Sequence, residues 1–311
     1  MPPRDHGPTY PEYIIASFED MEEVHPPESP TSFIVRDSLN PYREALLVGG
    51  VVASDPAVAE RKDMAIDLDK ILESDIVSYR ASNLLRWASA LESVKGDLRL
   101  TPEKRAIIEQ EVKEGAIIIF MPGRATQLET TVDEYQQLRP KWIKDSQPQT
   151  LDDTYIWDHL ASLISNKDQS LVQAVPVRPY FMLIKPTATV EPRTVSKTVD
   201  LQKQELVKIN QERKTAGLAP AQVVNPAEYA AFMQLATERV QQLSSQPLNN
   251  LTPPDDVNVS YNSFINLPLS SGGNVPRGYF YPDDRRLRFG WGGAAGADAG
   301  GGFRLSVRTE I

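Results

Sequence analysis

The chain has 311 residues with a hydrophobic fraction of 41%, which supports a substantial core and excludes global disorder. Its 42 acidic and 33 basic residues give a formal net charge of −9, which disfavours general binding to nucleic-acid phosphates. The absence of cysteine excludes disulfides, thiolate metal sites and cysteine nucleophiles.

Residues 1–42 form a proline-rich segment, and we expect an extended arm there. Prolines at positions 2, 3, 8, 11, 26, 27, 30 and 41 interrupt any helical period. Within this arm, Tyr13–Phe18 and Ser32–Val35 are short apolar runs. Each run can add a strand to a neighbouring sheet or pack on its own domain, and the sequence leaves both alternatives open.

No targeting segment is recognisable at the N-terminus. Residues 1–6 lack an apolar run after their charge, and no window of the sequence approaches about eighteen uninterrupted apolar residues. We therefore expect no secretion through a signal peptide, no membrane insertion, and a location in a virion or in the cytoplasm.

Residues 43–186 are expected to form a helical α+β domain. Apolar residues at helical spacing predict one helix after the Asp-Pro pair at 55–56, a second over 75–93 and a third over 101–115. The run Ala-Ile-Ile-Ile-Phe-Met at 116–121 is short, branched and followed by Pro-Gly, which predicts a buried strand.

Three further elements are predicted in the same domain. The sequence Thr-Val-Asp-Glu at 131–134 matches a capping box and predicts a short helix. Thr150 begins a longer helix, whose apolar stripe consists of Tyr155, Ile156, His159, Leu160, Leu163 and Ile164. Leu171–Ile184 alternates apolar and polar residues but contains Pro176 and Pro179, so we expect one or two strands near a sheet edge.

Residues 187–245 are expected to form a linker followed by amphipathic helices over 197–215 and 226–245. Residues 246–311 are expected to form a β-rich, glycine-containing tail, with strands over 257–269, 279–281, 286–291 and 303–309. The predicted fold class is therefore α+β: a mainly helical N-terminal half with a few buried strands, and a β-rich C-terminal region, with extended proline-rich and glycine-rich ends.

No residue pattern predicts a catalytic, cofactor or metal site. His6 and His25 lie far apart in the proline-rich arm, and His159 lies on an apolar stripe, where a core or subunit contact is expected before a catalytic base. The glycine runs lack the spacing of phosphate-binding loops. Paired aspartates suit a helix N-terminus or turns without any ligand: Asp152-Asp153, Asp255-Asp256 and Asp283-Asp284.

Arginines and aromatic residues alternate near the C-terminus. This composition is typical of protein interface hot spots, and it also suits base stacking and phosphate neutralisation in nucleic-acid binding. Because the net charge is negative, we predict a protein interface here. Its candidate residues are Tyr279, Phe280, Arg286, Arg288, Phe289, Trp291, Phe303 and Arg304.

The same C-terminal segments carry one family resemblance. Arg277-Gly278-Tyr279-Phe280, Arg286-Leu287-Arg288-Phe289 and Gly302-Phe303-Arg304-Leu305 resemble the closing strands of the C-type-lectin-like fold found in sulfatase-modifying factors. The resemblance covers residues 277–305. The tryptophan-rich core of that family is not found upstream, and its catalytic cysteines cannot exist in this chain. We therefore carry over neither the fold nor the activity.

These observations predict a structural component of a large protein assembly, such as a viral capsid or virion protein. Extended terminal arms would contact copies of the chain and other proteins of the same assembly. An enzyme is not expected. The alternatives are a nucleic-acid-binding protein that uses the C-terminal arginines and aromatic residues, and an enzyme with an unrecognised site near His159, Asp158 and Asp153.

Overall fold

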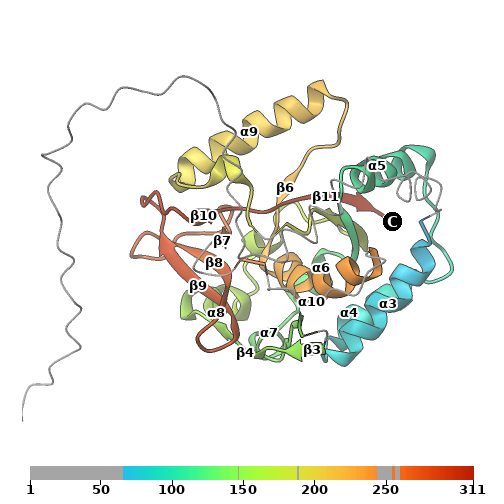
Figure 1. Ribbon diagram of the computed structural model, residues 1–311, viewed down its shortest axis with the longest axis horizontal. Coiled ribbons are helices and arrows are strands. Elements are labelled where there is room, and N and C mark those ends of the chain that lie inside the picture. The colour runs from blue at the N-terminus through green and yellow to red at the C-terminus, as the bar shows by residue number, and fades with distance from the viewer. Residues whose placement is uncertain (1–65, 146, 188, 244–253, 256–259) are drawn as a thin grey trace, which may run out of the picture. The chain divides into compact units, whose positions relative to one another are not determined.

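Helices and strands divide along the chain as the sequence predicts. The computed structural model describes residues 66–145, 147–187, 189–243, 254–255 and 260–311, in which there are eight α-helices and eleven β-strands (Figure 1). Helices dominate the N-terminal half, and the regular elements from residue 261 onward are strands, which confirms the α+β class. The predicted arm and the start of the first predicted helix lie outside the described residues.

Local sequence signals position several helices. The predicted capping box is confirmed: the Glu134 N–H donates to Thr131 Oγ1 (3.2 Å), and the Thr131 N–H donates to Glu134 Oε2 (2.7 Å). The Thr101 hydroxyl caps the helix that begins at Pro102 by accepting from the Lys104 N–H. The helices are α3 Leu68–Ala81, α4 Leu85–Glu92, α5 Pro102–Lys113, α6 Arg124–Leu128, α7 Val132–Gln136, α8 Asp158–Ser165, α9 Val199–Thr215 and α10 Pro226–Leu243.

The helix predicted over 75–93 is in fact two helices, α3 and α4. Between them Asn83 adopts a φ of 59°, and the Leu84 N–H donates to the Tyr79 carbonyl (2.8 Å). Asparagine tolerates this left-handed conformation, which ends a helix even where the apolar spacing continues. The resulting turn brings Trp87 edge-on to Tyr79, with ring centroids 5.2 Å apart.

The first sheet has four antiparallel strands in the order β1-β5-β11-β6. These are β1 Ile117–Met121, β5 Tyr180–Ile184, β11 Leu305–Glu310 and β6 Gln222–Val223. The buried strand predicted at 116–121 is confirmed as β1. The edge position predicted within Leu171–Ile184 is wrong, because β5 lies between β1 and β11. Pro176 and Pro179 precede the strand, so they remove no donor from its ladder.

Side chains close the outer edge of β1. The Asp75 carboxylate accepts from the Phe120 N–H (2.8 Å), and the Tyr79 hydroxyl donates to the Phe120 carbonyl (2.9 Å). From α10, Arg239 Nε donates to the Ile118 carbonyl (3.3 Å). The backbone groups that this edge strand would otherwise leave unpaired therefore bond to α3 and α10.

The second sheet has five strands in the order β10-β7-β8-β9-β4. These are β10 Gly301–Gly302, β7 Tyr261–Ser263, β8 Asn274–Tyr281, β9 Arg286–Gly293 and β4 Asp152–Ile156. The glycine-containing region expected as a tail thus forms β9 and β10, and the chain then continues into β11 of the other sheet. Of the strand predicted over 257–269, the structure has β7, and residues 257–259 lie outside the described part.

The prediction of a helix that begins at Thr150 is wrong for the first half of that segment. Residues up to Ile156 form β4, and α8 begins only at Asp158. Tyr155 and Ile156 pair with Arg288 and Phe289 of β9, so pairing with a strand distant in sequence prevails over a local helical spacing. A short hairpin of β2 Lys141–Lys144 and β3 Gln147–Thr150, which the sequence analysis does not predict, precedes β4.

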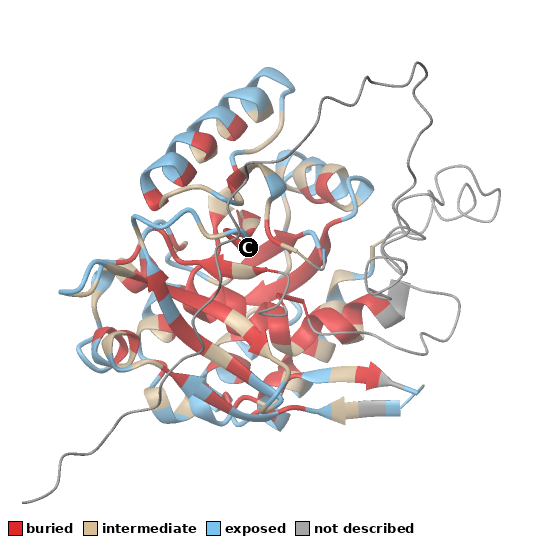
Figure 2. Ribbon diagram, turned by 60° about the vertical axis from the view of Figure 1, so that its left-hand side comes forward, coloured by how far each residue is buried: buried red, intermediate tan, exposed pale blue. Residues whose placement is uncertain are grey.

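Helix α10 is the centre of the core. Over residues 226–240 its side chains are buried on nearly all sides, as Figure 2 shows by colour. Tyr229 of α10 contacts Phe264 and Phe289 edge-on beside the five-stranded sheet, and Arg239 reaches β1 of the other sheet. One hydrophobic cluster therefore extends from α3 to β11. Among the described helices, none combines the length and the apolar character that a membrane crossing requires.

Candidate interaction surface

The five-stranded sheet carries tyrosines and arginines on its outer face. Successive side chains of a strand point to opposite faces, so Phe280 and Leu287 enter the core while their neighbours point outward. We name the outward set the tyrosine–arginine face. It consists of Tyr155, Tyr261, Tyr279, Tyr281, Arg286 and Arg288. Arg277 alternates onto the same side of the sheet but is buried, with 6% of the residue exposed.

Arg288 is held in one orientation at the middle of this face. Its guanidinium carbon lies 4.2 Å from the ring centroid of Tyr281 and 5.6 Å from that of Tyr155. It also forms an ion pair with Asp284. Burial raises the pKa of Tyr279, the cross-strand neighbour of Arg288, against the opposing charge of that arginine. The Tyr279 phenol therefore stays neutral at physiological pH beside a fixed cation.

Two glycines of β9 allow side chains of β8 to lie flat on the sheet. A Cβ at Gly292 would clash with the Arg277 guanidinium, and a Cβ at Gly290 would clash with the Tyr279 ring. Arg277 stacks on Tyr261 at 4.5 Å from its ring centroid and is fixed by an ion pair with an aspartate. The glycines that suggest flexibility in the sequence thus have a packing role.

The eight predicted interface residues divide between the surface and the interior. Tyr279, Arg286 and Arg288 lie on the tyrosine–arginine face. Trp291 is 55% exposed, but the alternation of side chains along β9 places it on the opposite face of the sheet. The other four pack inside this chain, with at most 3% of each residue exposed, and are removed from the candidate interface: Phe280, Phe289, Phe303 and Arg304.

Arg304 is part of a buried ion pair. Its Nε donates to Asp255 Oδ2 (2.7 Å), and a second guanidinium nitrogen donates to Oδ1 (2.8 Å). The Asp255 carboxylate also accepts from the hydroxyls of Tyr229 (3.1 Å) and Ser260 (2.8 Å). Burial raises the pKa of Tyr229 well above its usual range. This network joins the segment before β11 to α10, which is a structural role.

The acids that the sequence places near His159 do not converge on it. His159 Nε2–H donates to the Pro268 carbonyl (3.1 Å), whereas Asp153 forms an ion pair with Arg139. Among the described residues, no hydrogen bond joins His159 to Asp153 or Asp158, and no group of three or more acidic or histidine side chains could hold a metal ion. In the described structure His159 therefore bonds to a main-chain carbonyl and to neither of these two acids.

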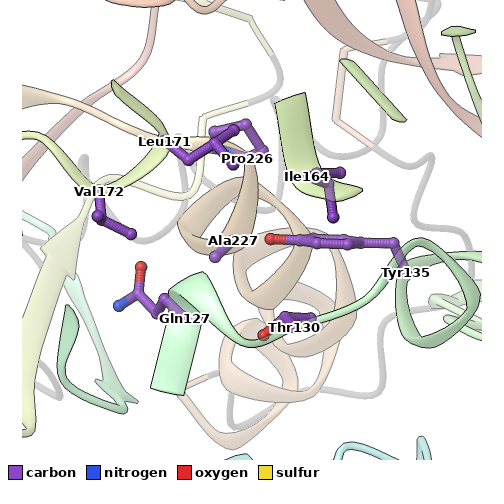
Figure 3. Close-up of a pocket in the computed structure, with 8 residues that line it drawn as sticks. All are labelled: Gln127, Thr130, Tyr135, Ile164, Leu171, Val172, Pro226 and Ala227. Atoms are coloured by element: carbon purple, nitrogen blue, oxygen red, sulfur yellow. The ribbon is translucent and has the colours of Figure 1, made fainter. Parts of the chain in front are cut away.

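A small cavity and an open groove lie among the described residues. Figure 3 shows the first, where Tyr135 points toward Ala227 and Gln127. Its volume is about 10 Å³, room for one water molecule. The second is an open groove of about 800 Å³ between α3, α10 and the β2–β3 hairpin. There the Trp142 indole N–H and the Gln234 amide oxygen have no hydrogen-bond partner among the described residues.

Tyr155 and Tyr281 belong to this face but are not among the eight residues predicted from the sequence. The alternation Arg286-Leu287-Arg288-Phe289 is a period-two signal that separates the outward arginines from the inward apolar residues. Tyr155 gave no such signal because its segment fits a helical period. No protein-family model matches this chain, and neither a curated protein nor a solved structure matches it.

Proposed function

We propose that this chain is a structural component of a large protein assembly, such as a viral capsid or another virion protein, and that a neighbouring subunit docks on the tyrosine–arginine face. The observation that carries the proposal is Arg288, which two tyrosine rings and Asp284 hold at the surface. Tyrosine and arginine supply much of the binding energy at protein interfaces. A side chain that is already fixed loses little entropy on binding.

The charges on this face favour a protein partner over nucleic acid. Arg277 and Arg288 each pair with an aspartate. Two other C-terminal arginines, Arg304 and Arg308, are buried in ion pairs with carboxylates. With a net charge of −9, little positive potential remains to collect phosphates. We propose copies of this chain as the first partner, and other proteins of the same assembly as further ones.

Light scattering on the purified chain tests the proposal. The expected particle is many times heavier than the 34.7 kDa chain. Replacing Tyr155 and Arg288 by alanine should shift it toward monomer without changing the circular dichroism spectrum. Arg99→Ala is the matched control, because Arg99 is 92% exposed on the helical side of the chain. A wild-type chain that stays monomeric, or a particle of unchanged size when both Tyr155 and Arg288 are replaced, would contradict docking on this face.

The nucleic-acid alternative is tested with the same variants. It requires a labelled single-stranded oligonucleotide to bind at low salt, and the binding to be lost when Arg286 and Arg288 are replaced by alanine. We expect no such binding. Salt-sensitive binding that depends on these two residues would replace the protein-docking proposal.

A further inference from the structure

The open groove between α3, α10 and the β2–β3 hairpin has the size of a binding site. Its volume of about 800 Å³ lies within the range of about 300–1,000 Å³ that is usual for such sites. The apolar part of its wall consists of Val77 and Ala81 on α3 and of Trp142 and Ile143 on β2. Val77 is 64% exposed, so a segment bound in the groove would remove apolar surface from water.

Two neutral polar atoms of the same wall are buried without a hydrogen-bond partner among the described residues. They are the Trp142 indole N–H, which can only donate, and the Gln234 amide oxygen, which can only accept. Buried polar groups are nearly always paired in folded proteins. A peptide unit has one carbonyl and one N–H, so a main chain close to this wall could supply both missing partners.

The charged residues of the groove already have partners. Lys70, Glu73 and Arg139 each form an ion pair with another group of this chain. Glu238 accepts from the Ser74 hydroxyl (2.7 Å). A charged ligand would have to displace such partners, so the groove favours an uncharged occupant.

An uncharged segment of this kind precedes α3 in the chain. The described part begins at residue 66, just before α3, and 65 residues precede it. The longest stretch of residues 1–65 without a charged or histidine side chain is 45–54, Ala-Leu-Leu-Val-Gly-Gly-Val-Val-Ala-Ser. Gly49-Gly50 lies at its centre, where glycine lets a main chain approach a surface closely, and leucine and valine lie on both sides.

The connection to α3 is long enough to place this segment in the groove. Residues 54–65 can span roughly 40 Å when extended, at about 3.3 Å per residue. The 14 residues of α3 rise by about 1.5 Å each, so the helix is about 21 Å long. Every part of the α3 wall is therefore within reach, and the covalent link gives an effective concentration on the order of millimolar.

We propose that residues 45–53 of this chain bind in the groove. The Trp142 indole N–H would donate to a carbonyl of Gly49-Gly50, the Gln234 amide oxygen would accept from an N–H of this pair, and the flanking apolar side chains would cover Val77. This inference does not depend on the proposed assembly, because it concerns a single chain. Binding here would fix the point beside α3 from which residues 1–42 extend.

Disulfide trapping in the full chain tests the proposal, since the chain has no cysteine of its own. Val77→Cys is combined with Leu46→Cys, Val48→Cys, Val51→Cys or Ala53→Cys, one pair in each variant. A disulfide requires Cα atoms within about 7 Å of each other. At least one pair should close within a single chain under mild oxidation, seen as a monomer of altered mobility on a non-reducing gel.

The pair that closes fastest is then compared with itself in matched backgrounds. Leu47→Asp places a charge against the apolar wall and should slow closure about tenfold, whereas Ser54→Asp, outside the segment, should leave the rate unchanged. Trp142→Phe keeps an aromatic ring but removes the indole N–H, and it should slow closure about threefold. Trp157→Phe is its control. Circular dichroism verifies that each variant is folded.

Three outcomes would overturn the proposal. The first is that no pair closes, and the second is that Leu47→Asp and Ser54→Asp close equally fast. The third is a disulfide that forms only between chains, seen as a dimer on the gel, which would assign the groove to a neighbouring copy. An unchanged rate in Trp142→Phe would refute the bond between the indole and the glycine main chain.

Discussion

Replacing Arg304 tests whether this arginine is an interior clamp or an interface residue. Arg304→Ala removes both guanidinium bonds to Asp255 and the longer bond to Thr187. Asp255 is fully buried, so its carboxylate would keep only the hydroxyls of Tyr229 and Ser260 as bonding partners in this network. A buried charge that loses its counter-ion is a severe perturbation.

The expected loss in the free energy of unfolding is about 3–5 kcal/mol, the usual cost of removing one partner of a buried ion pair. Because a folded domain is stable by only about 5–15 kcal/mol, such a variant should lose a large part of its stability. Arg286→Ala is the matched control. Arg286 is exposed, and its replacement should change the free energy of unfolding by no more than about 0.5 kcal/mol.

Urea unfolding followed by tryptophan fluorescence measures both variants. Double replacement of Asp255 and Arg304 by apolar residues of similar volume should restore part of the loss, because no unpaired charge then remains. If Arg304→Ala were no more destabilising than Arg286→Ala, the stabilising role of the buried Arg304–Asp255 ion pair would be refuted. Arg304 would then return to the candidate interface.

Two further variants test the packing of the core. Gly278→Ala should lower the free energy of unfolding by about 1–3 kcal/mol, because the added Cβ would clash with the buried Tyr229 ring. Gly272→Ala is the control and should be neutral, because its Cβ has room. Thermal unfolding measures both variants. Burial raises the pKa of Asp75 to about 7 against the opposing charge of Arg239, so the folded chain binds more protons than the unfolded chain between about pH 4 and 7. The free energy of unfolding should therefore fall as pH rises through that window, by up to about 1.4 kcal/mol per pH unit. Asp75→Asn should reduce this dependence on pH, measured as the urea midpoint at each pH. An unchanged pH dependence in the variant would contradict the raised pKa of Asp75.

Elements with a local signal were predictable from the sequence. The capping box at Thr131, the helix after Thr101 and the buried run at 116–121 are each specified by neighbouring residues, and the structure has all three. The errors arise where pairing with a strand far away in the sequence determines the secondary structure or the position in the sheet. β4 is a strand because β9 lies beside it, and β5 is central because β11 from the end of the chain pairs with it.

The candidate site was predictable in composition but not in geometry. The arginines and aromatic residues near the C-terminus do form a surface, but sequence alone did not separate Arg288, which points outward, from Arg304, which points inward. Arg304 is buried only because Asp255, far upstream, supplies a counter-ion inside the fold. Such a pairing leaves no trace in local spacing.

The side chains that close β1 also limit how the sheet can grow. An unprotected edge strand is a template for an incoming strand, and this is how many chains aggregate or exchange segments. Here Asp75, Tyr79 and Arg239 already use the backbone groups that an added strand would need. A neighbour's arm could extend the four-stranded sheet at β1 only by first displacing α3, so strand exchange during assembly would have to use another edge of the molecule.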